Sequence, residues 1–151
     1  MMKRLSFVLA AALSVMVMAG VATAIAADFG TAAEAKAMLE KAVKAVKADK
    51  AKALAMFAKG EGGFKDRDLY PFCGASDGNF TAHPTLVGKS LKGLKDKAGK
   101  PLGEEIYKVA QEGKISEVSY MWPRPGSTEP VQKVTFVTKI GDQVCAVGYY
   151  K

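Results

Sequence analysis

Apolar side chains recur at helical spacing in the stretch that follows the apolar N-terminus. They form one stripe, with lysines on the opposite face, made of Met38, Leu39, Ala42, Val43 and Val46. Thr31 and Glu34 lie three residues apart, the spacing of a capping box in which each side chain bonds the backbone N–H of the other residue. The pattern therefore predicts a helix over residues 30–49.

A second helix is predicted directly after the first. Asp49 is a favourable N-cap and Gly60 a favourable C-cap, and Leu54, Met56 and Phe57 between them face inward. Both helices are rich in alanine and lysine. We interpret this region as a packing helix pair, whose long first helix offers a surface for a homodimer, and not as a ligand site.

From residue 64 onward the pattern changes to strands. The segment "DLYPFCG" (68–74) alternates and is rich in aromatic residues, and Pro71 would place this strand at a sheet edge or a bulge. The segment "GNFTAH" (78–83) follows across Asp77-Gly78, a strong signal for a hairpin turn. The two segments are therefore predicted to pair as a hairpin.

One short helix and three strands complete the pattern. The segment "GEEIYKVAQEG" (103–113) has helical spacing, with Ile106, Val109 and Ala110 on one side. Strands are predicted over residues 115–122, 130–140 and 143–150. This order predicts an α+β fold, with a five-stranded antiparallel sheet that carries helices on one face and a concave pocket on the other.

The N-terminus has the pattern of a secretory signal peptide. A short positive region precedes an apolar run, and Ala24-Ile25-Ala26 supplies small residues for cleavage. We expect residues 1–26 to be a signal peptide and residues 27–151 to form a single domain, which would make the protein periplasmic. Because the apolar run is long enough to span a bilayer, an uncleaved anchor is the competing interpretation.

Charge and cysteine content restrict the partners. The formal net charge of +7 falls to +5 when Lys3 and Arg4 leave with the leader, and the lysines are scattered, so nucleic acid is not an expected partner. Small organic anions fit better. Cys73 and Cys145, the only cysteines, suggest one disulfide in an oxidising compartment, with two buried thiols as the alternative.

An ordered set of motifs resembles the single Cache domain of the second type, a PAS-like extracytoplasmic sensor module of bacterial chemoreceptors and histidine kinases. The shared features are an aromatic strand, an Asp-Gly turn, a His-Pro pair, an "L-x-G", a "Y-x-W-x-[KR]-P-G"-like segment with "P-x-x-K", and an aromatic last strand. They occur here at Tyr70, Asp77-Gly78, His83-Pro84, Leu86–Gly88, Tyr120–Gly126, Pro130, Lys133 and Gly148-Tyr149.

The resemblance implies a sheet of order 2-1-5-4-3, with a long N-terminal helix and a short crossover helix. In that order the first and last strands are neighbours, which would bring Cys73 and Cys145 close together although they are not part of the family pattern. Family receptors continue into a transmembrane helix and a signalling domain. Since this sequence stops at its last predicted strand, we expect a stand-alone secreted sensor whose partner is a membrane chemoreceptor or histidine kinase.

The resemblance also implies a small ligand, commonly a short carboxylate, in a pocket over the sheet. Arg124 and Lys133 would supply positive charge, and Tyr120 and Trp122, two apart on one strand, would form an apolar wall. The predicted ligand-binding residues are Tyr70, His83, Tyr120, Trp122, Arg124 and Lys133.

Simpler roles compete for four of these side chains. Trp122 could be core, Arg124 a solvated loop charge, Lys133 an outer-face residue, and His83 a side chain that bonds a loop carbonyl. Which of these roles applies depends on where the loops and strands place each side chain.

Other classes of function fit less well. Cys73 with His83 is the one Cys/His pair for a catalytic nucleophile, and a disulfide at Cys73 would remove the thiolate. His83 with Asp77 falls short of a metal site, and no cofactor loop occurs, so we expect no enzyme, metal or cofactor. The predicted function is a periplasmic ligand-binding sensor for signal transduction or chemotaxis; the alternative is an adaptor that docks on a membrane receptor without a ligand of its own.

Overall fold

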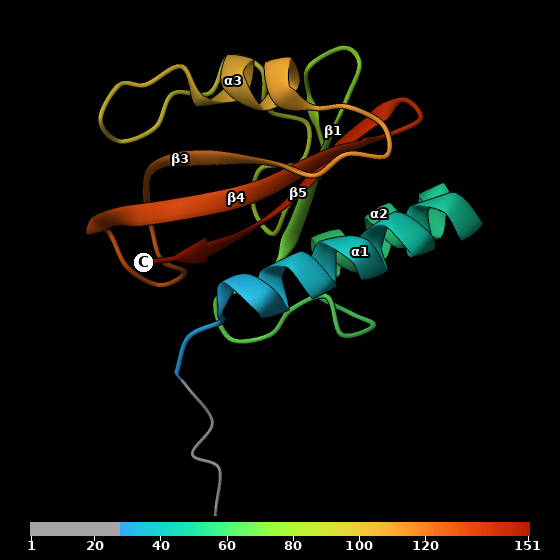
Figure 1. Cartoon of the computed structure of the whole chain (residues 1–151), viewed down its shortest axis with the longest axis horizontal. Helices are drawn as coiled ribbons and strands as arrows, with labels where there is room; N and C mark the ends of the chain where they lie inside the picture. The colour runs from blue at the N-terminus through green and yellow to red at the C-terminus, as the bar shows by residue number, and fades with distance from the viewer. Residues whose placement is uncertain (1–27) are drawn as a thin grey trace, which may run out of the picture.

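The computed structural model describes residues 28–151; the predicted signal peptide lies outside the described residues. Five strands form one sheet, and three helices pack against it (Figure 1). The helices are α1 (Ala32–Ala48), α2 (Lys50–Lys59) and α3 (Leu102–Val109), and the strands are β1 (Pro71–Ala75), β2 (Phe80–Ala82), β3 (Ser116–Pro123), β4 (Pro130–Ile140) and β5 (Gln143–Tyr150).

The sheet has the order β2-β1-β5-β4-β3, and each neighbouring pair of strands is antiparallel. This confirms the α+β class and the strand order that the family resemblance implied. The last strand lies at the centre of the sheet because β5 pairs with β1 on one side and β4 on the other. The first and the last strand are therefore neighbours in the sheet.

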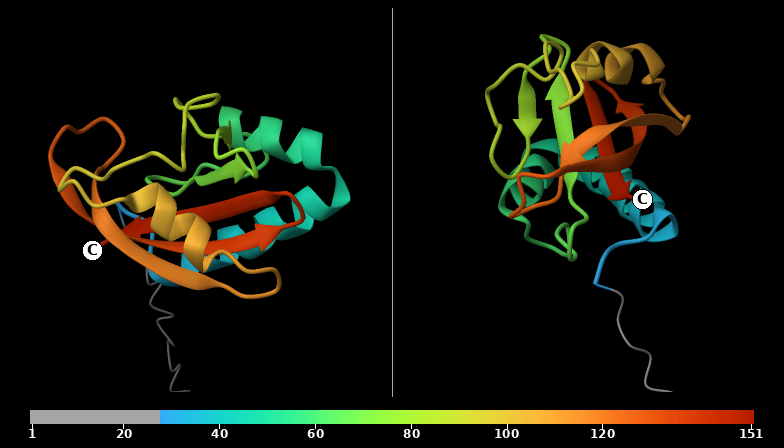
Figure 2. Two further views of the ribbon diagram at one scale, coloured as in Figure 1. Left: turned by 90° about the horizontal axis from the view of Figure 1, so that it is seen from above. Right: turned by 90° about the vertical axis from the view of Figure 1, so that its left-hand side faces the viewer.

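The helices lie on both faces of the sheet, so the expectation that they share one face was wrong. α1 and α2 pack against one face, and α3 lies across the other (Figures 1 and 2). The reason is the amphipathicity of α3, whose Leu102 and Ile106 are buried among apolar side chains of the second face.

The predicted helix caps are present. Thr31 and Glu34 form the capping box of α1, and the Asp49 side chain accepts a hydrogen bond from the backbone N–H of Lys52 at the start of α2. Gly60 ends α2 in the left-handed conformation, with φ of 70°, which glycine adopts without steric cost. These local signals determine where the first two helices begin and end.

Two predicted boundaries differ from the structure. The strand predicted over 68–74 begins only at Pro71. It is not an edge strand, but it carries an irregularity of register between Cys73 and Gly74, as expected of a strand with a bulge, and Pro71 precedes the residues that pair with β2. α3 ends at Val109, before the predicted Gly113, because Gln111 turns away and its carbonyl accepts the backbone N–H of Lys139.

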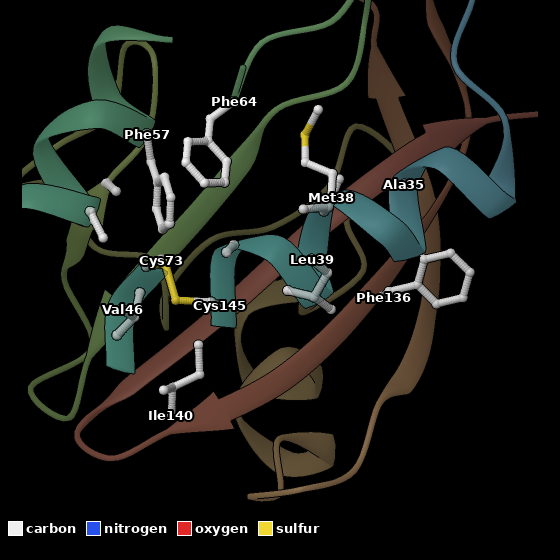
Figure 3. Close-up of a cluster of buried hydrophobic side chains, with 14 of the residues drawn as sticks. Ala35, Met38, Leu39, Val46, Phe57, Phe64, Cys73, Phe136, Ile140 and Cys145 are labelled. Carbon is white, nitrogen blue, oxygen red and sulfur yellow. A yellow bond between two sulfur atoms is a disulfide. The ribbon is translucent and has the colours of Figure 1, made fainter. Parts of the chain in front are cut away.

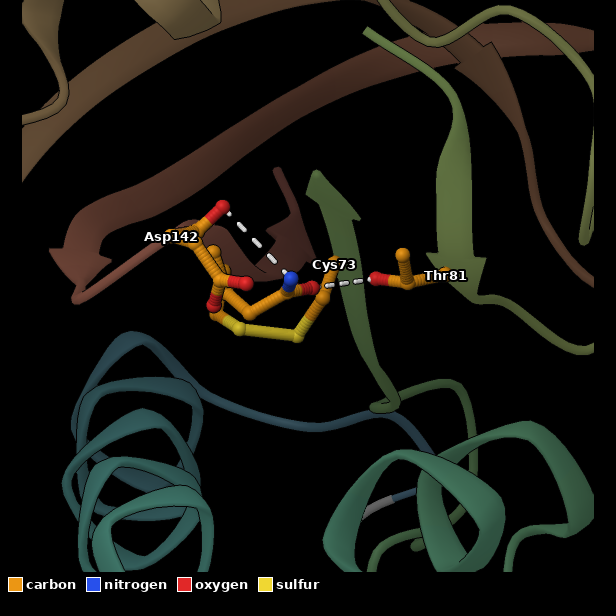
Figure 4. The surroundings of a disulfide bond; sticks show 5 residues. Cys73, Thr81 and Asp142 are labelled. Atoms are coloured by element: carbon orange, nitrogen blue, oxygen red, sulfur yellow. Dashed lines mark hydrogen bonds between the residues drawn. A yellow bond between two sulfur atoms is a disulfide. The ribbon is translucent and has the colours of Figure 1, made fainter. Parts of the chain in front are cut away.

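The core has two parts, one on each face of the sheet. Beneath α1 and α2, a cluster that includes Leu39, Phe57, Phe64 and Phe136 fills the space against the strands (Figure 3). The Cys73–Cys145 disulfide lies in this cluster and joins residues that face each other across β1 and β5 (Figure 4). The predicted bridge is therefore present.

We expect the double substitution Cys73→Ala and Cys145→Ala to lower the free energy of unfolding by about 3 kcal/mol, because the bridge closes a long loop and so restricts the unfolded chain. The two residues are 72 apart in the sequence. Urea denaturation of the variant and of oxidised and reduced wild type measures the effect. Equal midpoints for oxidised and reduced wild type would contradict this role for the bridge.

Candidate functional site

Two predicted site residues, Tyr120 and Lys133, and a third residue, Tyr150, lie side by side on neighbouring strands of the sheet. Lys133 on β4 faces Tyr120 on β3 and Tyr150 on β5 in the strand register. Residues directly opposite one another in an antiparallel sheet point to the same face. Their side chains therefore all lie on the face that α3 partly covers, and the alternative that Lys133 lies on the outer face is wrong.

Lys133 is a buried lysine, with 1% of its surface exposed. Its Nζ donates a hydrogen bond to the Tyr70 hydroxyl at 3.2 Å, and it lies 4.5 Å and 4.7 Å from the ring centroids of Tyr70 and Tyr150. Aromatic faces attract a cation, but they compensate only part of the cost of removing it from water. Burial accordingly lowers the pKa of Lys133 to about 7, although the nearby Asp68 carboxylate opposes this shift.

Gly148 makes room for the lysine. It pairs with Thr135 across β4 and β5, and a Cβ at position 148 would overlap the Lys133 side chain and the Thr135 hydroxyl. The Thr135 hydroxyl is in turn 2.8 Å from the Tyr120 hydroxyl. The glycine in the last strand thus serves close packing of the lysine stem.

Arg124 lies in the loop after β3, with 25% of its side chain exposed. Its guanidinium carbon lies 4.3 Å from the centroid of the Phe29 ring and 4.9 Å from that of Tyr150. Its Nε is 3.6 Å from Asp68 Oδ2, an ion pair without a hydrogen bond. Arg124 is therefore a partly buried cation held mainly by aromatic rings, and the alternative of a solvated loop charge does not describe it.

His83 lies in an aromatic environment beside Lys133. Its ring packs edge-on against Tyr70 and Phe80, and its Nδ1 accepts hydrogen bonds from the backbone N–H groups of Thr85 and Leu86 at 3.0 and 3.2 Å. The histidine therefore organises the turn after Pro84 by accepting from amides, not by donating to a carbonyl. Burial and the charge of Lys133 lower the pKa of His83 to about 4, so the ring is neutral at pH 7.

Two cavities share Tyr70 and Trp122 as lining residues. The larger, of about 480 Å³, lies between the end of α2 and the loop 122–126, and Arg124 and Thr85 line it. The smaller, of about 20 Å³, lies beneath α3 and is lined by apolar and aromatic side chains together with His83. It is large enough for about one water molecule.

The structure brings the six predicted residues together, although in different positions. Tyr70 and Trp122 line both cavities, Arg124 lines the larger one, and His83 and Tyr120 line the smaller one. Lys133 lines neither and lies behind Tyr70, to which it donates. Three further residues belong to this arrangement and were not predicted: Phe29, Asp68 and Tyr150.

The sequence carried a signal for only one of these three residues. Tyr150 lies two residues after Gly148 and so shares its face of the sheet, and the alternation of β5 could have indicated this. Asp68 and Phe29 lie outside the helices and strands, and no periodic pattern marks them.

Some chemistries find no support in residues 28–151. Cys73 is disulfide-bonded, so the one Cys/His pair that the sequence offers as a nucleophile and base is absent. Within this range no group of three or more His, Cys, Asp or Glu side chains could hold a metal ion, and no helix is long and apolar enough to cross a membrane. The larger cavity is lined by aromatic side chains, Tyr70 and Trp122, and by the cation Arg124.

The sequence profile of the family described as Single Cache domain 2 matches residues 8–148. The chain belongs to this family. Cache domains are extracytoplasmic, non-catalytic sensor domains that bind ligands, and this agrees with the pocket described above.

Solved structures of chemotaxis proteins share the Cache fold. A methyl-accepting chemotaxis protein from Vibrio parahaemolyticus is 25% identical with a TM-score of 0.64, over 78% of this chain and 86% of that one. A periplasmic sensor domain of a chemotaxis protein is 27% identical with a TM-score of 0.60, over 77% of this chain and 87% of that one. The fold described above is therefore shared with sensor domains of chemotaxis proteins.

Two further relatives are more limited matches. A Cache chemosensory domain, solved for the basis of its carboxylic acid recognition, shares the fold with a TM-score of 0.55 and 22% identity, over 77% of this chain and 85% of that one. The methyl-accepting chemotaxis protein McpP of Pseudomonas putida is 32% identical over 56 residues, which is 37% of this chain and 10% of McpP. The chain thus matches only a small part of a complete chemoreceptor.

We expect Lys133→Met to raise the free energy of unfolding at pH 6, where the buried ammonium is charged in both states of the wild type. Above pH 7 the folded wild type loses this proton while the unfolded chain keeps it up to about pH 10, so wild-type stability rises with pH. The advantage of the variant should therefore shrink by about 1.4 kcal/mol per pH unit at most. Urea denaturation at pH 6, 7.5 and 9 measures it.

Lys139→Met is the matched control, because Lys139 lies on the same strand and is exposed. Its effect on stability should not vary over this pH range. An advantage of Lys133→Met that stayed constant from pH 6 to 9 would show that Lys133 keeps an ordinary pKa.

We expect the ring of His83 to stay neutral down to about pH 5, because burial disfavours its charged form. Since the unfolded chain binds this proton near pH 6.5, the folded state should lose stability as the pH falls from 6.5 to 4. His83 is the only histidine, so its ring protons can be followed by NMR without assignment. A titration midpoint of the His83 ring above pH 6 would contradict the expectation that burial keeps this ring neutral.

Proposed function

We propose that this chain is a periplasmic sensor that binds a small organic anion, a short carboxylate, with Arg124 and Lys133 as its positive charges. The observation that carries the proposal is the buried Lys133. Among the described residues, no carboxylate lies within ion-pair distance of its ammonium group. A buried cation without a close counter-ion is costly, and a bound anion would compensate it.

The geometry around Lys133 supports a ligand over a purely structural role. Tyr70 lines the larger cavity, and its hydroxyl accepts a hydrogen bond from the Lys133 ammonium group. Trp122 and Arg124 lie on the same cavity wall, so an anion there would meet a guanidinium fork and an aromatic surface together. His83, neutral at pH 7, would contribute a wall and an N–H donor rather than charge.

The carboxylic acid recognition of the related Cache chemosensory domain supports this choice of ligand class. Signal transduction or chemotaxis through a membrane chemoreceptor or histidine kinase is the output that we propose, because the related structures come from chemotaxis proteins. A homodimer through the exposed lysine-bearing face of α1 is part of the same proposal. The signal peptide at residues 1–26 would deliver the domain, residues 27–151, to the periplasm.

The test is a titration of the purified protein with acetate, propionate and succinate, followed by calorimetry and by the fluorescence of Trp122, the only tryptophan. Acetamide, the uncharged analogue of acetate, is the ligand control. Acetate or propionate should bind and acetamide should not. If none of the carboxylates binds the folded protein, the adaptor alternative is favoured instead.

We expect Arg124→Ala to weaken carboxylate binding by at least about tenfold, the usual effect of losing a charge-assisted hydrogen bond. Lys44→Ala is the matched control, because Lys44 is an exposed cation on α1, on the other face of the sheet. It should leave the dissociation constant unchanged. Equal affinity of Arg124→Ala and wild type for acetate would show that the anion binds elsewhere.

A further inference from the structure

Asp68 is a buried carboxylate next to the proposed anion site, and only 5% of its surface is exposed. Its Oδ1 accepts a hydrogen bond from the backbone N–H of Gly30 at 2.7 Å. Its Oδ2 has no hydrogen-bond partner among the described residues, and neither has Arg124 Nε, 3.6 Å away. Buried polar atoms are rarely left unbonded, so this pair needs an explanation.

Asp68 also acts on Lys133. Its charge raises the pKa of the lysine against the larger effect of burial, so its field reaches the ammonium group behind Tyr70. The carboxylate therefore lies within electrostatic reach of both cations of the proposed site and is hydrogen-bonded to neither. In this position it partly neutralises the charges that would attract a ligand.

The contact between Arg124 and Asp68 is weaker than the contact that a free carboxylate could make. A guanidinium fork binds a carboxylate best through two parallel hydrogen bonds, and the distance of 3.6 Å provides none. The guanidinium instead lies over the rings of Phe29 and Tyr150, and 25% of the side chain is open to solvent. An arriving carboxylate can therefore offer Arg124 a better partner.

We propose that Asp68 is the internal counter-ion that a ligand carboxylate displaces from Arg124, so that Asp68 lowers and sets the affinity of the site. The inference rests on the proposed function, since it requires a carboxylate at Arg124. It assigns Asp68 a positioning role: the residue holds the arginine in the ligand-free position and repels an anion until the arginine turns toward it.

The same contacts connect the site to the start of α1. The Asp68 carboxylate accepts a hydrogen bond from the backbone N–H of Gly30, and the Arg124 guanidinium lies over the ring of Phe29. Phe29 and Gly30 are the two residues before Thr31, the N-cap of α1. Gly30 packs against Leu69 so closely that a Cβ there would overlap the leucine. When Arg124 turns toward a ligand it leaves Phe29, and the segment before α1 loses one of its contacts.

Asp68→Asn tests the proposal because the amide keeps an oxygen for the Gly30 N–H and removes only the charge. Acetate should bind the variant about fivefold more tightly than wild type, the effect of one competing, partly exposed ion pair. Asp142→Asn is the matched control: Asp142 is an exposed acid that pairs with Lys50, neither residue lines the larger cavity, and its loss should change acetate affinity less than twofold. Circular dichroism checks that both variants are folded.

Hydrogen exchange gives a second readout. Saturating acetate should speed the exchange of amides in residues 28–33 of wild type, and acetamide should not. Equal or weaker acetate binding by folded Asp68→Asn, while wild type binds acetate, overturns this inference and leaves the proposed function standing. Absence of binding to wild type and variant alike overturns both, whereas binding to the variant alone supports the displacement of Asp68.

Discussion

The burial of one ammonium group, that of Lys133, on the α3 face of the sheet is the constraint on which the candidate site depends. Lys133 can lie there because the register of three strands places Tyr120 and Tyr150 beside it and because Gly148 leaves space for its stem. Two aromatic rings and one hydroxyl stabilise the cation without neutralising it. A methionine of similar length would avoid the desolvation cost, so stability does not explain a lysine at this position, and this is the basis of the proposed anion site.

The two faces of the sheet carry different kinds of side chain: one is an apolar core, and the other also contains the buried Lys133. The face beneath α1 and α2 is a dry apolar core that contains the disulfide. That bridge joins β1 and β5, the strands whose ends carry Tyr70 and Tyr150, the two rings around Lys133. By fixing the pairing of these strands from the back, the bridge also limits how far the two rings can move apart. Rigidity on one face thus supports the polar chemistry on the other.

The features that follow from local rules could be predicted from the sequence. Capping at Thr31 and Asp49, the hairpin at Asp77-Gly78 and the common face of Tyr120 and Trp122 depend on a few neighbouring residues. The side of the sheet that Lys133 occupies depends on the register, and the position of α3 on the second face depends on packing, so neither followed from periodicity alone. Asp68 and Phe29 meet Arg124 through loops of irregular backbone, for which the sequence has no comparable pattern.

The balance of buried charge bears on the kind of ligand that we propose for the site. When Lys133 is protonated, Lys133 and Arg124 are positive, Asp68 is negative and His83 is neutral, which leaves one positive charge among these four side chains for a ligand to balance. A single carboxylate satisfies this requirement, whereas a dicarboxylate would leave a second negative charge among aromatic rings near Asp68. Since burial, opposed only in part by the charge of Asp68, lowers the pKa of Lys133 to about 7, an anion nearby would raise it again and keep the lysine protonated. Ligand and lysine would thus stabilise each other's charged form, and a neutral isostere could not take the place of the anion.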